Sequence, residues 1–171
     1  MIHRHIFRIA LSLAVIAGAS AAHAKPAPTL FTAADVERIA PPLDHGCILG
    51  AAAKAATPDQ KIEHCTAGIA AFEAIKAKSK SASERAGMDF LIATFDFARA
   101  GSYLKIDTVR SARVCASAER VFALMVGIDA KLFDTKMAES MIISRAGVSR
   151  SVVVCRQDFG TPSGAPAILT E

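Results

Sequence analysis

The sequence predicts an all-α protein, a single-domain helical bundle of about five main helices preceded by short N-terminal helices. Apolar residues recur at spacings of three and four over most of residues 32–159, as they do on the buried face of a helix. Capping residues (Ser, Thr and Asp) stand before these segments, and Gly or Pro follows them. Only residues 151–155, with their β-branched run, have the composition of a strand.

The N-terminus has the layout of a secretory signal peptide over residues 1–24. A positively charged stretch precedes the apolar run 9–17, and Ala22-His23-Ala24 satisfies the small-x-small rule for cleavage. The run is too short to span a bilayer, and no later run reaches about 18 apolar residues. We therefore expect an exported protein, periplasmic or secreted, without an integral membrane anchor.

The charge of the mature chain is small. Removal of residues 1–24 from the 171-residue chain leaves 147 residues, enough for one domain. The whole chain has 20 Lys and Arg against 16 Asp and Glu, but two of these cations belong to the removed segment, so the net charge falls from +4 to +2. The nearest approach to a basic patch is Lys76, Lys78 and Lys80, at the end of a predicted helix, where cations complement the helix dipole. We expect no nucleic-acid partner.

The first elements of the mature chain are short. Residues 25–31 contain two prolines and little to bury, which predicts a flexible lead-in. A Thr N-cap then starts a predicted helix over 33–40, and a pair of prolines ends it. The Ala-rich segment 47–56 predicts a second short helix.

Two long helices follow. Thr57-Pro58-Asp59-Gln60 combines a Thr N-cap, a Pro at the first helical position and a Gln that closes a capping box, and it predicts a helix over 58–78. A second capping box at residues 81–84 begins a helix over 81–101, with Gly101 at its end. The apolar arc of this second helix is wide, so we expect it at the centre of the fold.

Three further segments complete the predicted bundle. Aspartates precede, and glycines follow, two helices expected over 107–126 and 130–146. Residues 148–158 predict the last helix, although their β-branched run also suits a strand. The Pro-, Gly- and Ser-rich residues 160–171 predict a loose C-terminal tail.

Four cysteines in a chain with an export signal predict two disulfides. Three pairings are possible, and Cys47–Cys65 with Cys115–Cys155 is favoured. Cys47 opens the short helix 47–56, and Cys65 lies early on the next helix. An antiparallel hairpin of these two helices would bring the first pair of sulfurs together.

A metal site is the alternative use of the first pair. The mature chain has only two histidines, His45 and His64, which together with Cys47 and Cys65 make a Cys2His2 set suited to zinc or copper. However, His64 and Cys65 are adjacent on a predicted helix, so their side chains point about 100° apart. No C-x-x-C or C-x-x-C-H motif accompanies them. The disulfide is favoured, and no cofactor is expected.

No motif predicts catalysis. The sequence lacks G-x-S-x-G and H-E-x-x-H, so neither a hydrolase elbow nor a zinc protease site is indicated. Asp89 and Asp96 lie seven residues apart on one predicted helix, with Arg85 and Arg99 at neighbouring turns. This spacing predicts a solvated, salt-bridged face rather than an acid–base pair.

The aromatic and methionine residues of the helices predict an ordinary core rather than a cofactor site. An exposed groove lined by them would overturn this expectation. The residues concerned are Phe90, Phe95, Phe97, Phe122, Phe133, Met125, Met137 and Met141.

These features favour a small exported, disulfide-linked helical protein that serves as a binding or interaction module without catalytic activity. Its partner would be a protein or a small ligand that the sequence does not identify. The alternative is a periplasmic metal-binding protein that uses His45, Cys47, His64 and Cys65. An enzyme ranks third, since only a pocket with converging polar groups would support one.

Overall fold

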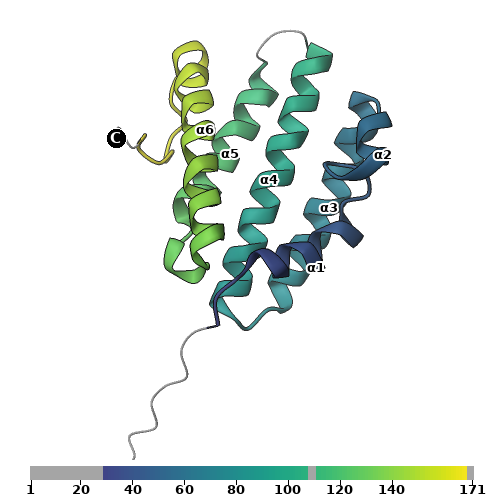
Figure 1. The fold of residues 1–171 in the computed structure, drawn as a ribbon. Helices are drawn as coiled ribbons and strands as arrows, with labels where there is room; N and C mark the ends of the chain where they lie inside the picture. Colours follow the sequence, from purple (N-terminus) through teal and green to yellow (C-terminus); the bar gives the residue numbers. More distant parts are fainter. Residues whose placement is uncertain (1–28, 108–110, 169–171) are drawn as a thin grey trace, which may run out of the picture.

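The fold is all-α, as predicted, in a computed structural model that describes residues 29–107 and 111–168. The signal peptide predicted for residues 1–24 lies outside these ranges. Within them the chain forms six α-helices and one short 3-10 helix, with no strand (Figure 1). The elements are α1 (Ala33–Leu43), α2 (Gly50–Ala55), α3 (Pro58–Lys78), α4 (Ala82–Asp107), α5 (Ala112–Gly127), η1 (Ala130–Leu132) and α6 (Thr135–Phe159).

Capping boxes fix the starts of α1 and α3. The Thr32 hydroxyl accepts the backbone N–H of Asp35 at 3.3 Å, and the Asp35 carboxylate accepts the backbone N–H of Thr32 at 3.0 Å. Thr57 and Gln60 repeat the arrangement, with distances of 3.3 and 2.9 Å. Each box satisfies backbone donors that a helix start otherwise leaves unpaired, which is why the sequence signal for these two starts is strong.

The predicted boundaries of the two short helices are wrong. Two prolines do not stop α1 at residue 40, because they occupy its last turn, where the only hydrogen bonds lost are those of their own missing N–H groups. The Asp44 N–H closes this turn on the Pro41 carbonyl. Helix α2 is shorter than the predicted 47–56, because residues 44–49 form a loop around the Asp44 side chain.

Two predicted helix stops are also wrong. Helix α4 continues through Gly101 to Asp107, and α6 continues through Gly147, so that the segments predicted as 130–146 and 148–158 form one helix of 25 residues. Residues on both sides of Gly147, such as Met141 and Val148, share one buried face. Packing of this face outweighs the cost of a mid-helix glycine, about 1 kcal/mol.

The start of α5 also differs from the prediction. Because α4 takes in Asp107, that residue does not cap the next helix, and Ser111 does so by accepting the N–H of Val114. Asp129 caps the 3-10 helix η1, whereas Asp134 caps α6 by accepting the N–H of Met137 at 2.8 Å. The predicted end of α5 at Gly127 is confirmed.

The helices pack mainly on their neighbours in sequence. Helix α3 packs on α4, α4 on α5, and α5 on α6, while α4 and α6 hardly contact each other. Figure 1 shows α4 in the middle of the molecule, as predicted, with α6 at the opposite side of α5 from it. Helix α5 therefore forms the floor between two helices that stand apart.

An aromatic cluster joins α4 to the start of α6 at one end of the bundle. Phe31 is buried, with 3% of its surface exposed, and its ring packs edge-on against Phe133 at 5.9 Å between centroids. Phe90 of α4 packs on the other side of Phe133 at 6.2 Å. The Phe31 backbone donates to the carbonyl of Leu132 and accepts from the N–H of Asp134, at 2.8 and 3.0 Å.

The chain after α6 contacts the bundle. Arg156 donates to both carboxylate oxygens of Glu119, at 2.7 and 2.8 Å, and to the carbonyl of Pro166 at 3.0 Å. The hydrogen bonds to Glu119 raise the pKa of Arg156 above its usual value. Ile168 packs partly buried against the core. Within residues 29–107 and 111–168, none of the helices combines the length and apolarity needed to cross a membrane.

Candidate functional site

The structure contains two disulfides, Cys47–Cys65 and Cys115–Cys155, with Cα–Cα distances of 4.7 and 5.4 Å. These are the two pairs that the sequence favours. The first joins the loop before α2 to α3, and the second joins α5 to α6. Disulfides of this kind persist in oxidising compartments, so they indicate an extracytoplasmic location.

Asp44 builds the loop that carries Cys47. Its carboxylate is buried and accepts the backbone N–H groups of Gly46, Ile48 and Leu49, at 3.1, 2.8 and 3.0 Å. The Asp44 carbonyl accepts the N–H of Cys47 at 2.8 Å. A buried carboxylate is stable when it is fully hydrogen-bonded, and these bonds set the turn that presents Cys47 to α3.

The residues of the predicted metal alternative lie in this loop and on α3. Cys47 and Cys65 are bonded to each other, so neither has a thiolate to offer a metal. His45 is exposed, and His64 packs over Gly46, its Nδ1 atom buried without a hydrogen-bond partner. In the part of the chain that the structure describes, no group of three His, Cys, Asp or Glu side chains is placed to hold a metal ion.

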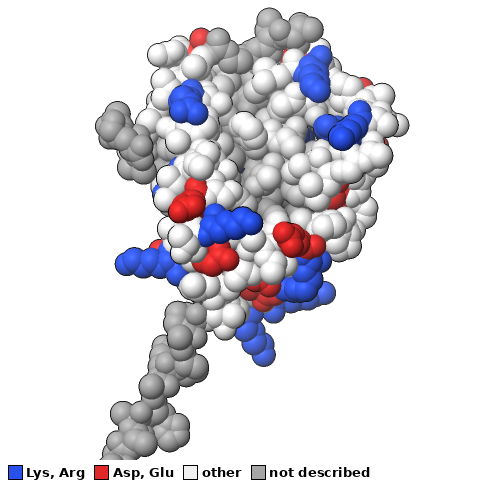
Figure 2. All heavy atoms as spheres, in the orientation of Figure 1, with Lys and Arg blue, Asp and Glu red and all other residues white. Residues whose placement is uncertain are grey.

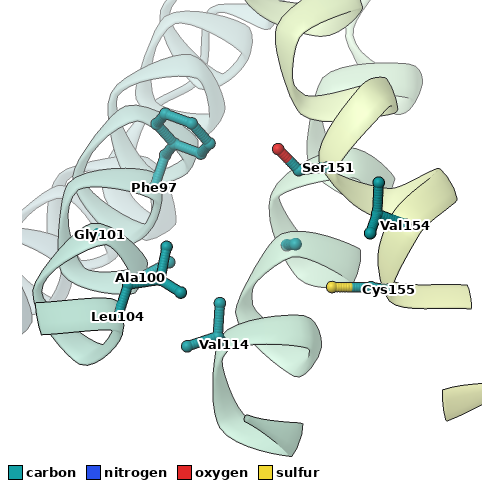
Figure 3. Close-up of a pocket in the computed structure, with 9 residues that line it drawn as sticks. Phe97, Ala100, Gly101, Leu104, Val114, Ser151, Val154 and Cys155 are labelled. Atoms are coloured by element: carbon teal, nitrogen blue, oxygen red, sulfur yellow. The ribbon is translucent and has the colours of Figure 1, made fainter. Parts of the chain in front are cut away.

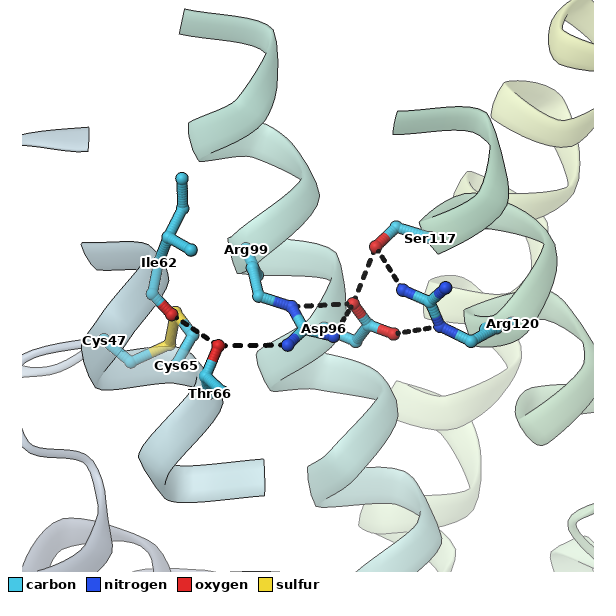
Figure 4. A network of polar contacts seen from close by, with 8 residues as sticks. All are labelled: Cys47, Ile62, Cys65, Thr66, Asp96, Arg99, Ser117 and Arg120. Carbon is cyan, nitrogen blue, oxygen red and sulfur yellow. Dashed lines mark hydrogen bonds and ion pairs between the residues drawn. A yellow bond between two sulfur atoms is a disulfide. The ribbon is translucent and has the colours of Figure 1, made fainter. Parts of the chain in front are cut away.

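Asp96 joins three helices. Its carboxylate accepts Arg99 Nε and Nη2 at 3.2 and 3.0 Å, Ser117 Oγ at 2.8 Å and Arg120 Nε at 3.2 Å (Figure 4). Arg99 reaches on to Thr66 of α3 at 3.0 Å. The prediction of a solvated face is wrong for Asp96, which is only 4% exposed, because α5 covers it and supplies two of its partners.

The other members of the predicted polar face have separate partners. Asp89 pairs with Lys76 of α3 at 2.5 Å, a partly buried ion pair between the two helices. Arg85 donates to the carbonyl of Ser79 in the α3–α4 connection at 3.1 Å. These groups are engaged in holding α3 to α4, and none of them converges on a cavity.

An apolar cavity lies between α4 and α6, over α5. It has a volume of about 380 Å³, and a smaller pocket of about 160 Å³ shares the lining residue Phe97 with it. We call the two pockets together the α4–α6 groove. Figure 3 shows the α4 side chains facing those of α6 across the larger pocket, with Val114 of α5 below them. The lining residues are Thr94, Phe97, Ala100, Gly101 and Leu104 of α4, Val114, Ala118 and Met125 of α5, and Ser144, Gly147, Val148, Ser151, Val154 and Cys155 of α6.

Small residues leave open space in the groove. Gly101 and Gly147 face each other's helices within it, and a Cβ atom built at either position would meet no atom within 4 Å. The glycines are therefore not needed for close helix packing. They leave open space where most residues would project a side chain. In the sequence a glycine after a helical segment predicts a helix stop, so neither residue was predicted as a site residue.

The hydroxyl groups of Thr94 and Ser151 are hydrogen-bonded within their own helices. Thr94 Oγ1 donates to the Phe90 carbonyl at 2.8 Å, and Ser151 Oγ donates to the Gly147 carbonyl at 3.5 Å. Among the described lining residues none is acidic or basic, and Cys155 is oxidised. The groove offers apolar contact and no group for acid–base chemistry.

The expectation that the aromatic and methionine residues are ordinary core is wrong for Phe97 and needs qualification for Met125. Phe97 is 47% exposed, although it lies two helical turns from buried Phe90 on the same face of α4. Met125 is buried but lines the smaller pocket. This is the exposed groove that would overturn the expectation. Phe97 is exposed because α6, which would have to cover it, diverges from α4.

Charged groups surround the groove but do not enter it. At the end of α4, Asp107 accepts hydrogen bonds from Arg113 and Ser111, which hold its pKa below the usual value. In the upper half of Figure 2 the surface is hollowed and almost free of charge, with Lys and Arg side chains on both sides of the hollow. Most Asp and Glu side chains visible in this view lie in the lower half.

The fold and the site define a disulfide-linked all-α protein with an apolar surface groove. The chain matches no protein-family model, no curated protein and no solved structure.

Proposed function

We propose that this protein is exported to the periplasm and binds an apolar, chain-shaped ligand in the α4–α6 groove. Export is supported by the signal-peptide pattern of residues 1–24 and by the two disulfides. Binding is supported by a groove whose volume falls in the range of ligand pockets and whose lining is apolar.

The observation that carries this proposal is the pair of glycines. Each lies inside a long helix, where glycine costs about 1 kcal/mol relative to alanine, and each faces open space rather than a neighbouring backbone. A mid-helix glycine without a packing role calls for another reason. Here the reason is room for a ligand between α4 and α6.

The test measures binding of the uncharged apolar dye N-phenyl-1-naphthylamine, which fluoresces in apolar surroundings, to the protein purified from the periplasm and stripped of lipid. We expect Gly101→Leu and Gly147→Leu to abolish binding, because leucine fills the open space. Both substitutions should raise the free energy of unfolding, by about 0.5–1 kcal/mol, because leucine is a better helix former than glycine. Loss of binding with gain of stability separates a blocked groove from an unfolded protein.

Gly127→Leu is the matched control, since Gly127 also faces open space but lies at the end of α5 and lines neither pocket. It should leave dye binding unchanged. Dye binding that persists in both groove variants would contradict the binding site. A protein whose intact mass retains residues 1–24 after expression would contradict the export part.

A further inference from the structure

Two cations are sequence neighbours of residues that line the larger pocket of the groove. Lys105 directly follows the lining residue Leu104 and lies one turn beyond Gly101. Arg150 precedes the lining residue Ser151 and lies one turn from Gly147. Both cations are exposed, so their charged ends lie in solvent.

Two acidic groups near this end of α4 and α6 take part in interactions of their own. Asp107 pairs with Arg113, a pair without net charge. Asp158, one turn beyond Val154 on α6, takes part in an interaction of its own. Figure 2 shows Lys and Arg side chains on both sides of the hollow, so the surface beside it carries positive charge.

The length of the groove fits an alkyl chain. Its α4 wall runs from Thr94 to Leu104, about 15 Å at the rise of an α-helix. An extended chain of about a dozen carbons has this length. A methylene chain has no polar atoms to satisfy, whereas an extended peptide would leave its backbone N–H and C=O groups unpaired against this lining.

We infer that the ligand is a fatty acid: a single alkyl chain lies along the groove, and its carboxylate lies at the rim beside Lys105 and Arg150. This inference rests on the proposed function and adds the charge of the ligand to it. The smaller pocket, lined by Met125 and Val148, takes the methyl end of the chain.

The experiment compares three amphiphiles with the same twelve-carbon chain: dodecanoate, dodecanol and dodecyltrimethylammonium. Each is titrated, below its micellar concentration and at low salt, against the protein loaded with N-phenyl-1-naphthylamine. We expect dodecanoate to displace the dye at about tenfold lower concentration than dodecyltrimethylammonium, with dodecanol between them. The advantage of dodecanoate should shrink as the salt concentration rises, because the cations are exposed.

Charge reversal at the rim tests the residues. The double variant Lys105→Glu, Arg150→Glu should weaken displacement by dodecanoate by about tenfold and leave displacement by dodecanol unchanged. Lys54→Glu carries the same type of charge change on exposed Lys54 of α2, outside the lining of the groove, and should change neither.

The outcomes separate the two proposals. If the dye binds in the groove but the three amphiphiles displace it equally, or if the double variant behaves as the wild type, the fatty-acid inference is wrong and the apolar site stands. If the dye binds and no amphiphile displaces it, the occupant is not an alkyl chain, and a partner helix becomes the occupant to test. If dye binding appears only on dilution of a dimer, a second copy of the chain fills the groove, and the inference is again wrong. If the dye does not bind, the proposed function itself fails.

Discussion

A carboxylate with 4% exposure needs a partner for nearly every lone pair, and Asp96 obtains its partners from two helices. Arg99 comes from its own helix, one turn along, while Ser117 and Arg120 come from α5. The spacing of Asp96 and Arg99 could be seen in the sequence, and their ion pair was predicted from it. The burial of Asp96 could not be predicted in this way, because it depends on α5, which begins 16 residues further along the chain.

Replacement of Asp96 should be among the most destabilising polar substitutions in the chain. Asp96→Ala leaves Arg99, whose side chain is only 16% exposed, without its counter-charge, and we expect a loss of about 3–5 kcal/mol in the free energy of unfolding. Arg120→Ala is the control, because the Arg120 side chain is 54% exposed and its loss should cost about 1 kcal/mol or less. Urea denaturation measures both, and equal losses would contradict this account of Asp96.

The role of Gly46 in the stability of the fold can also be tested by substitution. Its φ of 95° strains any other residue, and a Cβ atom there would lie 2.9 Å from His64 Nδ1. Gly46→Ala should cost about 1–3 kcal/mol for the backbone conformation alone, with the contact to His64 in addition. Gly160→Ala shares a positive φ, 79°, but meets no atom within 4 Å, so it should cost only the conformational part. Thermal or urea unfolding gives the difference between the two variants, and a difference of zero would remove His64 from the explanation.

At the scale of the elements, the helix starts that carry a capping box were predicted correctly. A capping box is a local pattern of four residues, so Thr32 and Thr57 could be recognised without any knowledge of the fold. A glycine ends a helix only when nothing favours its continuation, and tertiary packing decides this. Gly101 and Gly147 were therefore taken for stops, although α4 and α6 continue through them. At Gly147 the apolar face is buried on both sides of the glycine, and its packing carries the helix through.

The cap of α1 should give the protein a pH dependence. Hydrogen bonds from Arg38 and then from Thr32 hold the pKa of Asp35 below the ordinary value of 3.8. A carboxylate with a lowered pKa stabilises the fold above its unfolded-state pKa, and this stabilisation is lost as the pH falls through the folded-state value. We expect wild type to be more stable than Asp35→Asn near neutral pH, and the difference to shrink as the pH falls below 3.8. Urea denaturation between neutral pH and acid gives the difference directly, and a difference that does not change with pH would exclude Asp35 as its source.

At the scale of the whole molecule, the groove results from the order in which the helices pack. Each main helix covers the next one in the chain, and α4 and α6 are left apart above α5. Single-helix periodicity predicts which face of each helix is apolar, but not whether a second helix covers it. Phe97 continues the apolar stripe of Phe90 and yet faces solvent, so periodicity placed Phe97 on an apolar face without showing that this face lines a groove.

Removal of either disulfide should cost a similar amount of stability. On the chain-entropy estimate, Cys47–Cys65 and Cys115–Cys155, which span 18 and 40 residues, stabilise the protein by about 3 and about 4 kcal/mol. We therefore expect the Cys47→Ala, Cys65→Ala and Cys115→Ala, Cys155→Ala double variants to lose similar amounts of stability in urea denaturation.

Binding should distinguish these two variants. Cys155 lines the groove, and its bond holds α6 at a fixed distance from the α5 floor, whereas Cys47 and Cys65 lie on the far side of α4. Loss of the Cys115–Cys155 bond should weaken binding of N-phenyl-1-naphthylamine under conditions in which the variant is still folded, and loss of the Cys47–Cys65 bond should not. Equal dye affinity in the two folded variants would mean that the groove is held by helix packing alone.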